Sequence, residues 1–446
     1  MARSGAMYVP VGTGFLPVDP THIAIKMQNV LMKEFKMEHA LQVEILKELL
    51  GQVEEGRNID AGVQFRMPTT DYFCPDMAAK ELDAFFRNHP QLIGLSGDLP
   101  EPGSYLTMDD FGIPILATRD KSGQFHAFLN ACRHRSVKVA NEPRGKKNVF
   151  MCPFHSWSYA NTGNLLNIPD EDHFGAIDKS CHGLIELPTV DWNGMLWVHP
   201  NVDGELDIDA LMGDKLAAEL SMQDVSHYQF VGEKTIEMNL NWKFANDTFG
   251  ETYHFGKLHK DTLGRLFHGN NLHLEEFGRH HRFVTANLGI QGLRELPEED
   301  WRIHYGTFVL YHLFPNIQYL VDPHTATLIR IYPDEKKPGR SITRISFYYT
   351  EDMIQAVDAE KDAGVKVDDV YDHEGRQGKT GGVETSMEVF SSTVEQEDYV
   401  MGEMQQRAAE SGMLKEIVFG RNEPALHHFH RNYREALNMP PLERVE

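Results

Sequence analysis

Long apolar runs are missing from this chain of 446 residues. No stretch approaches the roughly 18 consecutive apolar residues that a membrane-spanning helix needs, so we expect no transmembrane segment. The first ten residues carry one arginine and are interrupted by glycine and proline before an apolar core develops, which makes them a poor signal peptide. These absences predict a cytoplasmic protein that is not bound to a membrane.

Positive charge is also scarce, because 43 lysines and arginines stand against 66 aspartates and glutamates and leave a formal net charge of -23. Such a chain repels phosphates, so nucleic acid and anionic lipid are excluded as main partners. A hydrophobic fraction of 41% with 24% charged residues is typical of a globular protein. The length allows two or three domains.

Cysteine is rare, and the four that occur are too few and too scattered for a disulfide scaffold. Two of them each precede a histidine in a short motif, Cys132-Arg-His134 and, seventeen residues later, Cys152-Pro-Phe-His155. Two such loops can face each other and supply four ligands to a metal centre. The other two, Cys74 and Cys181, lack a partner motif and are expected to be free, buried thiols.

Zinc is the structural alternative for this ligand set, since zinc binds Cys and His in tetrahedral geometry. Zinc loops usually pair Cys with Cys and His with His, whereas here each loop contributes one of each. That order suits a two-iron two-sulfur cluster in which one iron takes both cysteines and the other both histidines. We therefore favour a Rieske cluster on Cys132, His134, Cys152 and His155.

A Rieske cluster moves single electrons, so the chain should also contain an acceptor. Asp247, Glu251 and His254 are spaced i, i+4 and i+7 and would share one face of a helix. His259 would point about 140° away on an unbroken helix, so the helix must end or bulge near Gly256. In a chain with 23 histidines, such a pair alone is more often structural than catalytic.

Both regions resemble the ring-hydroxylating oxygenase α subunits. The resemblance covers residues 130–136 and 152–159, which match the Rieske loops, and residues 241–259, which match the mononuclear iron motif; it extends from about residue 65 to the C-terminal end. It implies that His254 and His259 bind iron. Ser136 and Ser156 stand where the family most often has glycine.

Non-haem iron that activates O2 needs one carboxylate besides two histidines. Residues 394–399 resemble the family's third-ligand segment, and the match falls on Asp398, with Glu395 and Glu397 as competing choices that would otherwise form a solvated helix face or cap. Glu251 matches the family's bridging carboxylate, commonly Asp, which would link His254 to His155 of a neighbouring subunit. Glu at this place is familiar among relatives that act on quaternary amines.

The residues that flank the matched ligands are the candidates for a substrate pocket: Asp247, Thr248, Phe255 and Val394. Asp247 stands where relatives often carry Asn, and it could hold a cation or be hydrogen-bonded within its own helix. The histidines at 268, 273, 280, 281, 427, 428 and 430 are expected to have packing or surface roles.

Hydrophobic periodicity and turn residues predict the following elements. We expect helices over 23–49 (ended by Gly51), 73–89 and from a Ser392 N-cap to Gly412; an acidic, helix-compatible linker over 203–224; strands over 113–118, 124–129, 149–151, 229–238, 308–313, 317–321, 327–332 and 341–349; and a surface loop over 358–385.

These elements and the resemblance predict an α+β protein. A small all-β Rieske domain (99–202) follows an N-terminal helical extension (1–60) and a helical lead-in (61–98). A larger catalytic domain (203–446) would carry an antiparallel sheet covered by helices, the helix-grip or START-like arrangement of the family.

The function implied is that of a terminal oxygenase that hydroxylates an organic, aromatic substrate by cis-dihydroxylation. Monooxygenation or demethylation of a quaternary amine is the alternative, and a pure electron-transfer or zinc-stabilised protein is the non-enzymatic one. The chain has no Gly-x-Gly-x-x-Gly fingerprint, so NAD(P)H must be oxidised by a separate reductase, directly or through a ferredoxin. The family implies a homotrimer, with or without β subunits.

Overall fold

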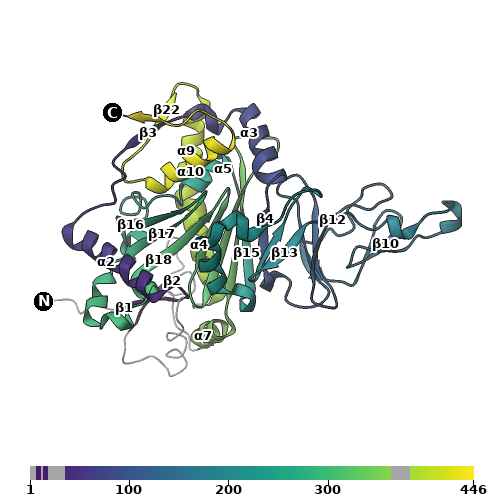
Figure 1. The fold of residues 1–446 in the computed structure, drawn as a ribbon, viewed down its shortest axis with the longest axis horizontal. Coiled ribbons are helices and arrows are strands. Elements are labelled where there is room, and N and C mark those ends of the chain that lie inside the picture. The colour runs from purple at the N-terminus through teal and green to yellow at the C-terminus, as the bar shows by residue number, and fades with distance from the viewer. Residues whose placement is uncertain (1–6, 12–13, 19–35, 363–381, 446) are drawn as a thin grey trace. The chain divides into compact units, whose positions relative to one another are not determined.

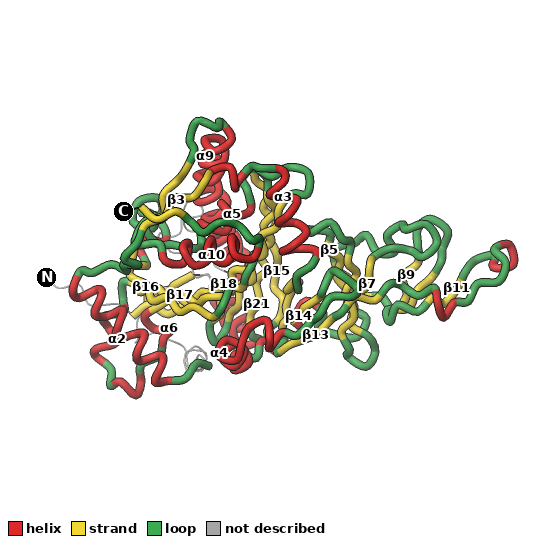
Figure 2. Tube along the Cα trace, turned by 45° about the horizontal axis from the view of Figure 1, so that its top comes forward, coloured by secondary structure: helices red, strands yellow, loops and turns green. Residues whose placement is uncertain are grey.

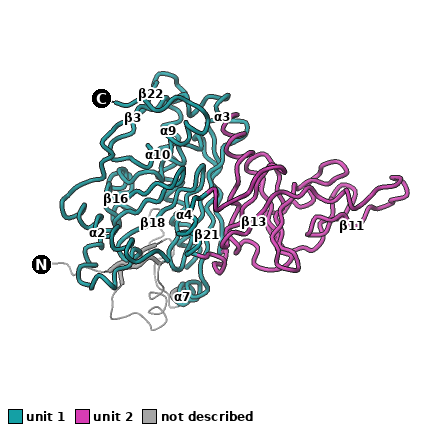
Figure 3. The backbone as a smooth tube through the Cα atoms, viewed as in Figure 1, with its two compact units in different colours: residues 1–77, 212–223, 231–446 teal, residues 78–211, 224–230 magenta. Residues whose placement is uncertain are grey.

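The computed structural model describes residues 7–11, 14–18, 36–362 and 382–445, and the chain divides into two compact units (Figure 1 and Figure 3). Unit 1 comprises residues 1–77, 212–223 and 231–446, and unit 2 comprises residues 78–211 and 224–230. Helices and sheets are segregated as in an α+β protein, which confirms the predicted fold class. Among the described residues, no helix is long and apolar enough to pass through a bilayer.

A seven-stranded sheet forms the centre of unit 1, in the order β15-β21-β20-β19-β18-β17-β16. Its strands are β15 (Gln229–Met238), β16 (Phe267–Phe277), β17 (His280–Asn287), β18 (Thr307–Leu313), β19 (Ile317–Val321), β20 (Thr325–Pro333) and β21 (Ser341–Tyr349). Neighbours from β16 to β21 pair antiparallel. Every residue of β19 and β20 is buried, so both faces of the sheet are covered there.

Five of these strands match the prediction, whereas β16 and β17 were missed. Their sequences contain His268, His273, His280 and His281, so they lack the plain apolar alternation that marks a strand. Cross-strand pairing and burial against helices compensate for the weak local signal.

Helices cover this sheet. The helices of unit 1 are α2 (His39–Glu55), part of α4 (Ile208–Gln223), α5 (Trp242–Asp247), α6 (Ile303–Gly306), α7 (Glu351–Asp362), α8 (Val383–Thr393), α9 (Tyr399–Glu410) and α10 (Pro424–Ala436). α5 contacts β20, β21 and α9, while α2 and α10 both contact β16 and β17. Figure 2 shows α5, α9 and α10 gathered beside the sheet.

Two smaller sheets complete unit 1. β1 (Met7–Val11) pairs with β2 (Gly14–Val18), and β3 (Gln64–Pro68) lies between β22 (Glu416–Phe419) and β23 (Glu443–Val445). The second of these sheets joins a segment from the N-terminal part of the chain to two from its C-terminal part.

The predicted N-terminal helix differs from the observed one. Residues 19–35 lie outside the described residues, and α2 continues through Gly51 to Glu55. It ends at Gly56, whose backbone is left-handed at φ 60° and closes the last turn. Gly51 does not stop the helix, because the buried neighbours Leu49 and Leu50 hold its last turns in place.

The C-terminal helical region also needs correction. Ser392 is not an N-cap: it lies inside α8, and its hydroxyl donates to the carbonyl of Val389 in the same helix. A π-helical turn, η11 (Val394–Asp398), then joins α8 to α9. The predicted loop over 358–385 overlaps the end of α7 and the start of α8, and residues 363–381 lie outside the described residues.

Unit 2 holds three small antiparallel sheets, as expected of the predicted β domain. Their strand orders are β12-β7-β6-β5-β8, β11-β10-β9 and β13-β14-β4. The strands are β4 (Gln91–Leu95), β5 (Ser104–Met108), β6 (Ile115–Arg119), β7 (Phe125–Leu129), β8 (Arg144–Lys146), β9 (Val149–Met151), β10 (Ser158–Ala160), β11 (Leu165–Asn167), β12 (Glu186–Leu187), β13 (Thr189–Trp192) and β14 (Met195–Val198). Helix α3 (Pro75–Glu81) and the π-helical turn η2 (Leu82–Arg87) fall within the predicted 73–89 helix.

Three buried histidines join α10 to the sheet of unit 1. His281 on β17 lies 3.0 Å from His428 on α10, measured between their Nδ1 atoms, and stacks on His312 of β18 with ring centroids 4.9 Å apart. Burial first, and then the neighbouring histidines, lower the pKa values of His281 and His312 well below the usual range, and burial lowers the pKa of His428. The cluster is therefore neutral at pH 7.

We expect unit 1 to lose stability in mild acid. The unfolded chain protonates these histidines below about pH 6.5 while the folded chain does not, so unfolding takes up protons and the free energy of unfolding falls as the pH drops. Below about pH 6.5, the free energy of unfolding falls by roughly 1.4 kcal/mol per pH unit for each histidine that stays neutral in the folded chain. Urea unfolding between about pH 7.5 and 5.5 measures it. His428→Gln should make the free energy of unfolding depend less steeply on pH, and an unchanged slope would contradict this account.

Candidate metal sites

Two loops of unit 2 hold the predicted cluster ligands, and both have the same backbone hydrogen bonds. β7 leads to Cys132 and β9 leads to Cys152. In each loop the serine four residues later donates its amide to the cysteine carbonyl at 2.9 Å. Each cysteine amide in turn donates 2.8 Å to the carbonyl five residues ahead, on Val137 or Trp157. The chain therefore builds two matching turns around the four predicted ligands.

The two serines of these turns have left-handed backbones, with φ of 57° at Ser136 and 58° at Ser156. Left-handed conformations cost an L-residue roughly 1–2 kcal/mol, whereas glycine adopts them freely. These are the two positions at which the family resemblance predicts glycine. The turn therefore keeps its shape here at some cost in conformational strain.

The two cysteines among the predicted cluster ligands are more deeply buried than the two histidines, as expected if one iron binds the cysteines and the other binds the histidines. Cys132 and Cys152 are buried free thiols in the core of unit 2, while His134 and His155 are half-buried with ring centroids 4.6 Å apart. The buried Nδ1 of His134 has no hydrogen-bond partner among the described residues. Desolvation, Arg135 and His134 lower the pKa of His155, which keeps its ring neutral, the form that binds metal. The donor set fits a two-iron two-sulfur cluster.

Tyr159 and Trp157 are both buried in the core cluster of unit 2 that also contains Cys132 and Cys152. Tyr159 has a further role, because its hydroxyl accepts the amide of Arg133 at 2.9 Å and lies 3.3 Å from Sγ of Cys132. Hydrogen bonds to the ligating sulfurs are among the features that set the reduction potential of iron–sulfur clusters. Trp157 stacks on His134 with ring centroids 5.3 Å apart. Sequence patterns do not distinguish these contacts from ordinary packing.

Cys74 is half-buried and Cys181 is exposed, so neither is buried as expected.

In unit 1, the predicted iron motif does not form the single helix that its spacing suggested. α5 ends at Asp247, and Glu251 and His254 lie in the turns that follow. Gly250 permits a close approach of this segment to α10, since a Cβ there would lie 2.3 Å from Cδ2 of Leu426. The turns, and not a shared helix face, direct His254 and His259 to the same place.

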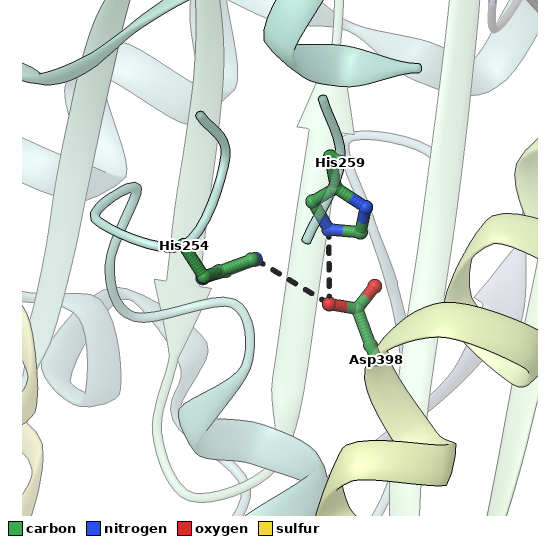
Figure 4. Close-up of side chains that lie close together, drawn as sticks. All are labelled: His254, His259 and Asp398. Atoms are coloured by element: carbon green, nitrogen blue, oxygen red, sulfur yellow. Dashed lines mark hydrogen bonds and ion pairs between the residues drawn. The ribbon is translucent and has the colours of Figure 1, made fainter. Parts of the chain in front are cut away.

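The three predicted iron ligands meet at one point, as Figure 4 shows. Oδ1 of Asp398 lies 3.0 Å from Nε2 of His259 and 3.4 Å from Nε2 of His254. One ligand atom from each residue lies within 4.8 Å of the others, the spacing of a single metal ion. Among the described residues no other group of three such ligands was found. Two imidazoles and a carboxylate match the ligand set of non-haem iron.

Each imidazole also has a carboxylate on its outer nitrogen. Nδ1 of His254 donates to Oε1 of Glu251, and Nδ1 of His259 donates to Oε2 of Glu397. Glu397 was expected to be a solvated helix face or cap if it was not the ligand, and that expectation was wrong. Glu395, the other competitor, is 36% exposed and lies 3.9 Å from Nζ of Lys234. The sequence did not reveal the role of Glu397, because its partner lies 138 residues away.

These contacts change the acid–base properties of the site. Burial disfavours charge on His254, but the carboxylates of Asp398 and Glu251 outweigh burial and raise its pKa to about 10. Burial likewise opposes charge on His259, and Asp398 and Glu397 raise its pKa. Burial would raise the pKa of Asp398, but the two imidazoles lower it. Without metal, protonated imidazoles balance the carboxylates, and metal binding must displace those protons.

An apolar cavity of about 70 Å³ lies next to the three ligands. Besides the ligands and Glu251 it is lined by Thr248, Phe249, Phe255, Leu263, Phe283, Phe308, Leu310, Leu320, Val389, Phe390, Thr393 and Val394. Both threonine hydroxyls donate to carbonyls of their own helices, at 2.8 Å from Thr248 and 3.0 Å from Thr393. The cavity therefore includes three of the four predicted pocket residues: Thr248, Phe255 and Val394.

The fourth, Asp247, lines a separate open groove of about 550 Å³ that reaches the ligands from another side. Its carboxylate accepts hydrogen bonds of 2.9 Å from the Tyr72 hydroxyl and from Nε2 of His430. The expectation of a bond within its own helix was therefore wrong. Glu423 and Lys257 also line this groove, with apolar Met401, Leu414, Val418 and Phe419.

A cluster-binding β domain and a separate His/His/Asp site define a two-centre iron oxygenase component. The Rieske [2Fe-2S] domain model matches residues 89–188, and the model of the ring hydroxylating alpha subunit (catalytic domain) matches residues 225–439. The chain belongs to the ring-hydroxylating family of Rieske non-haem iron oxygenase α subunits.

Its relatives act on different substrates, as their names state. The chain is 29% identical over 198 residues to the glycine betaine monooxygenase oxygenase subunit of Chromohalobacter salexigens, a stretch that covers 43% of each protein. It is 28% identical over 193 residues to the benzene 1,2-dioxygenase subunit alpha of Pseudomonas putida, covering 42% of each. The matched stretch is therefore less than half the length of these curated relatives.

Solved structures show the same fold over most of the chain. A quaternary ammonium Rieske monooxygenase in complex with L-carnitine has a TM-score of 0.66 at 18% identity, covering 85% of this chain and 97% of that one. Naphthalene 1,2-dioxygenase from Rhodococcus sp. bound to indole has a TM-score of 0.62 at 19% identity, covering 89% and 98%. The architecture is common to relatives of both substrate classes.

Replacing either left-handed serine by glycine should stabilise unit 2. Relief of about 1–2 kcal/mol of strain is partly offset by the larger unfolded-state entropy of glycine, about 0.4–1 kcal/mol. We expect Ser136→Gly and Ser156→Gly to raise the free energy of unfolding by up to about 1 kcal/mol each. Thermal loss of the cluster's visible absorption measures the effect. Ser136→Ala removes the hydroxyl but keeps the strain, and stabilisation by that control instead would contradict the explanation.

Proposed function

We propose that this protein is the terminal oxygenase of a multicomponent system, in which a Rieske cluster on Cys132, His134, Cys152 and His155 passes electrons to iron on His254, His259 and Asp398. The observation that carries the proposal is the convergence of two imidazoles and one carboxylate beside an apolar cavity. Bound there, ferrous iron supplies the chemistry that activates O2 for insertion into an organic substrate.

The chain's own side chains prepare this chemistry in three ways. Asp398, from η11, lies between the two imidazoles and completes the ligand set. Glu251 accepts a hydrogen bond from the outer nitrogen of His254, which would keep Nε2 of that ring directed at the iron. The apolar wall of the cavity excludes water from the substrate side and so limits side reactions.

We propose an apolar aromatic ring as the substrate. The residues that line the cavity provide no lysine or arginine to pair with a substrate carboxylate, and both threonine hydroxyls already donate to backbone carbonyls. Five phenylalanines surround the space instead. An engineered cavity of roughly 150 Å³ holds benzene, so a cavity of about 70 Å³ is too small for a fused pair of rings and would have to widen to admit a single ring. Cis-dihydroxylation is the reaction we assign to such a ring.

Oxidation of a quaternary amine is the second candidate. Two features favour it: the similarity to glycine betaine and carnitine monooxygenase oxygenase subunits, and Glu251, because the family resemblance associates a glutamate at this position with relatives that act on quaternary amines. Aromatic walls can also bind a quaternary ammonium group through cation–π attraction. A substrate that carries a carboxylate would need a cation to pair with it. Lys257, which lines the open groove together with His254 and Asp398, could supply that cation.

The partners we propose follow from what the chain lacks. With no dinucleotide fingerprint, the electrons of NAD(P)H must come through a separate reductase, directly or through a ferredoxin. A homotrimer, with or without β subunits, and a cytoplasmic location remain parts of the proposal. In such a trimer Glu251 would connect His254 to His155 of another copy. Both oxygens of Glu251 already accept bonds from its own loop, so the bridge must use their remaining lone pairs.

The surfaces of the two units are chemically suited to this contact between copies. The open groove beside Glu251 combines carboxylates with exposed apolar side chains, Leu414 at 44% and Val418 at 55% exposure. The cluster loops of unit 2 expose Phe154 at 53% together with Arg135, whose guanidinium lies over the Phe154 ring. Acidic and basic partners of similar apolar character favour a specific contact.

Asp398→Ala should remove the mononuclear iron and abolish turnover while the Rieske absorption stays unchanged, because only one of the two centres loses a ligand. Analysis of the wild type should find two irons and two acid-labile sulfides per chain for the cluster, and one further iron for the mononuclear site. Glu395→Ala, on the same helical turn but exposed, is the matched control and should behave as wild type. Zinc in place of iron, or turnover retained by Asp398→Ala, would overturn the assignment.

Substrate-dependent O2 uptake with a surrogate reductase should be fastest with single-ring aromatic hydrocarbons, slower with fused rings, and absent with glycine betaine and carnitine. The small apolar cavity without a cation is the reason. Analysis of the products as cis-diols distinguishes productive turnover from uncoupled O2 reduction. Uptake with choline or betaine, accompanied by aldehyde release, would favour the quaternary amine candidate instead.

A further inference from the structure

One imidazole of the iron site is held at both nitrogens by consecutive residues. Oδ1 of Asp398 lies 3.0 Å from Nε2 of His259, and Oε2 of Glu397 accepts a hydrogen bond from its Nδ1. The His259 side chain is only 1% exposed, and those of Glu397 and Asp398 are 14% and 9% exposed. The ring is therefore enclosed between two carboxylates from a single helical turn.

The backbone explains how neighbours in sequence can reach opposite ends of one ring. Both carboxylates belong to η11, a π-helical turn between α8 and α9. Consecutive side chains diverge on a helix, so they can pass on either side of a ring that faces the turn. π-helical turns of this kind occur frequently at functional sites. An ordinary continuation of α8 into α9 would place these two residues differently.

We propose that Glu397 is a positioning residue for the iron site, which fixes the tautomer and orientation of His259 and so sets the affinity of the site for ferrous iron. The inference rests on the proposed function only in that iron is the metal bound. Glu397 does not touch the metal in this assignment. It acts through His259 as Glu251 does through His254, so both iron-binding imidazoles have a carboxylate on the outer nitrogen.

A second contact restricts Glu397 itself. The buried hydroxyl of Thr262 donates to Oε2 of Glu397 at 3.2 Å, and the amide of Thr262 donates to the carbonyl of His259 at 2.9 Å. The loop that carries His259 therefore also holds the carboxylate that orients it. Gly264 closes the same loop, since a Cβ there would lie 2.5 Å from the carbonyl oxygen of Phe255. The Glu397 carboxylate is thus held by the same loop as the ring that it contacts.

Glutamate and glutamine at position 397 would interact differently with Nδ1 of His259, and the difference can be measured. A carboxylate only accepts, so it requires the proton on Nδ1 and leaves Nε2 free to bind metal. A glutamine amide can also donate, so it no longer selects this tautomer, although its size and its bond to Thr262 are kept. Partners of this kind typically contribute 10–100-fold in metal affinity.

Glu397→Gln is therefore the test, with Glu395→Gln as the same exchange two residues earlier on the same turn. The mononuclear site is emptied with a chelator, the intact Rieske absorption is verified, and ferrous iron is titrated back. We expect Glu397→Gln to bind iron about 10–100-fold more weakly and to change the EPR signal of the ferrous nitric oxide adduct, which reports ligand geometry. Glu395→Gln should match the wild type in both.

The outcomes separate this inference from the proposed function. Equal iron affinity and an identical EPR signal in Glu397→Gln and the wild type overturn the positioning role, even if the melting temperature falls, because a lower melting temperature alone shows only a structural contact. A wild type that takes up no third iron overturns the proposed function together with this inference. If Glu397→Gln does not fold, Thr262→Val, which removes one bond to Glu397, should weaken iron binding in the same direction, and unchanged binding would overturn the role.

Discussion

The structure of the catalytic unit depends on one short contact, the carboxylate of Asp398 placed between the imidazoles of His254 and His259. The two histidines lie in the segment after α5, and Asp398 lies in a π-helical turn about 140 residues later. The seven-stranded sheet supports both segments, because α5 contacts β20 and β21 while α9, which continues from the turn, contacts α5. The buried sheet thus supplies a rigid support for ligands that lie on loops.

The two cluster loops of unit 2 share one backbone conformation. The two turns repeat one backbone pattern around Cys132 and Cys152, although serine must adopt a left-handed conformation in each. Cys132 and Cys152 are buried and His134 and His155 are half-buried, so the histidine side of a bound cluster would be the more accessible side. Tyr159 adds a hydroxyl at the sulfur of Cys132. Conformational strain and a buried polar contact are both tolerated where the cluster is held.

Sequence reasoning reached most of this arrangement, and its failures have physical causes. The Cys-x-His and Cys-x-x-His loops, the strands β18 to β21 and the three iron ligands could be predicted because their signals are local or fall in matched motifs. β16 and β17 were missed, since buried histidines interrupt their apolar pattern. The helix expected through His254 ends at Asp247, and the partners of Glu397 and Asp247 were out of reach because long-range contacts leave no trace in spacing.

The carboxylates around the candidate iron site determine its electrostatics. Asp398, Glu251 and Glu397 surround two imidazoles, and burial alone would make such a group of charges costly. The imidazoles answer this by holding protons, as the raised pKa of about 10 at His254 indicates. The Nε2 atoms of these two rings, with Asp398, would hold a ferrous ion in place of those protons. Because Glu251 and Glu397 hold the two Nδ1 atoms, contacts within the protein set the orientation of the rings, and the cost of organising the site falls on folding.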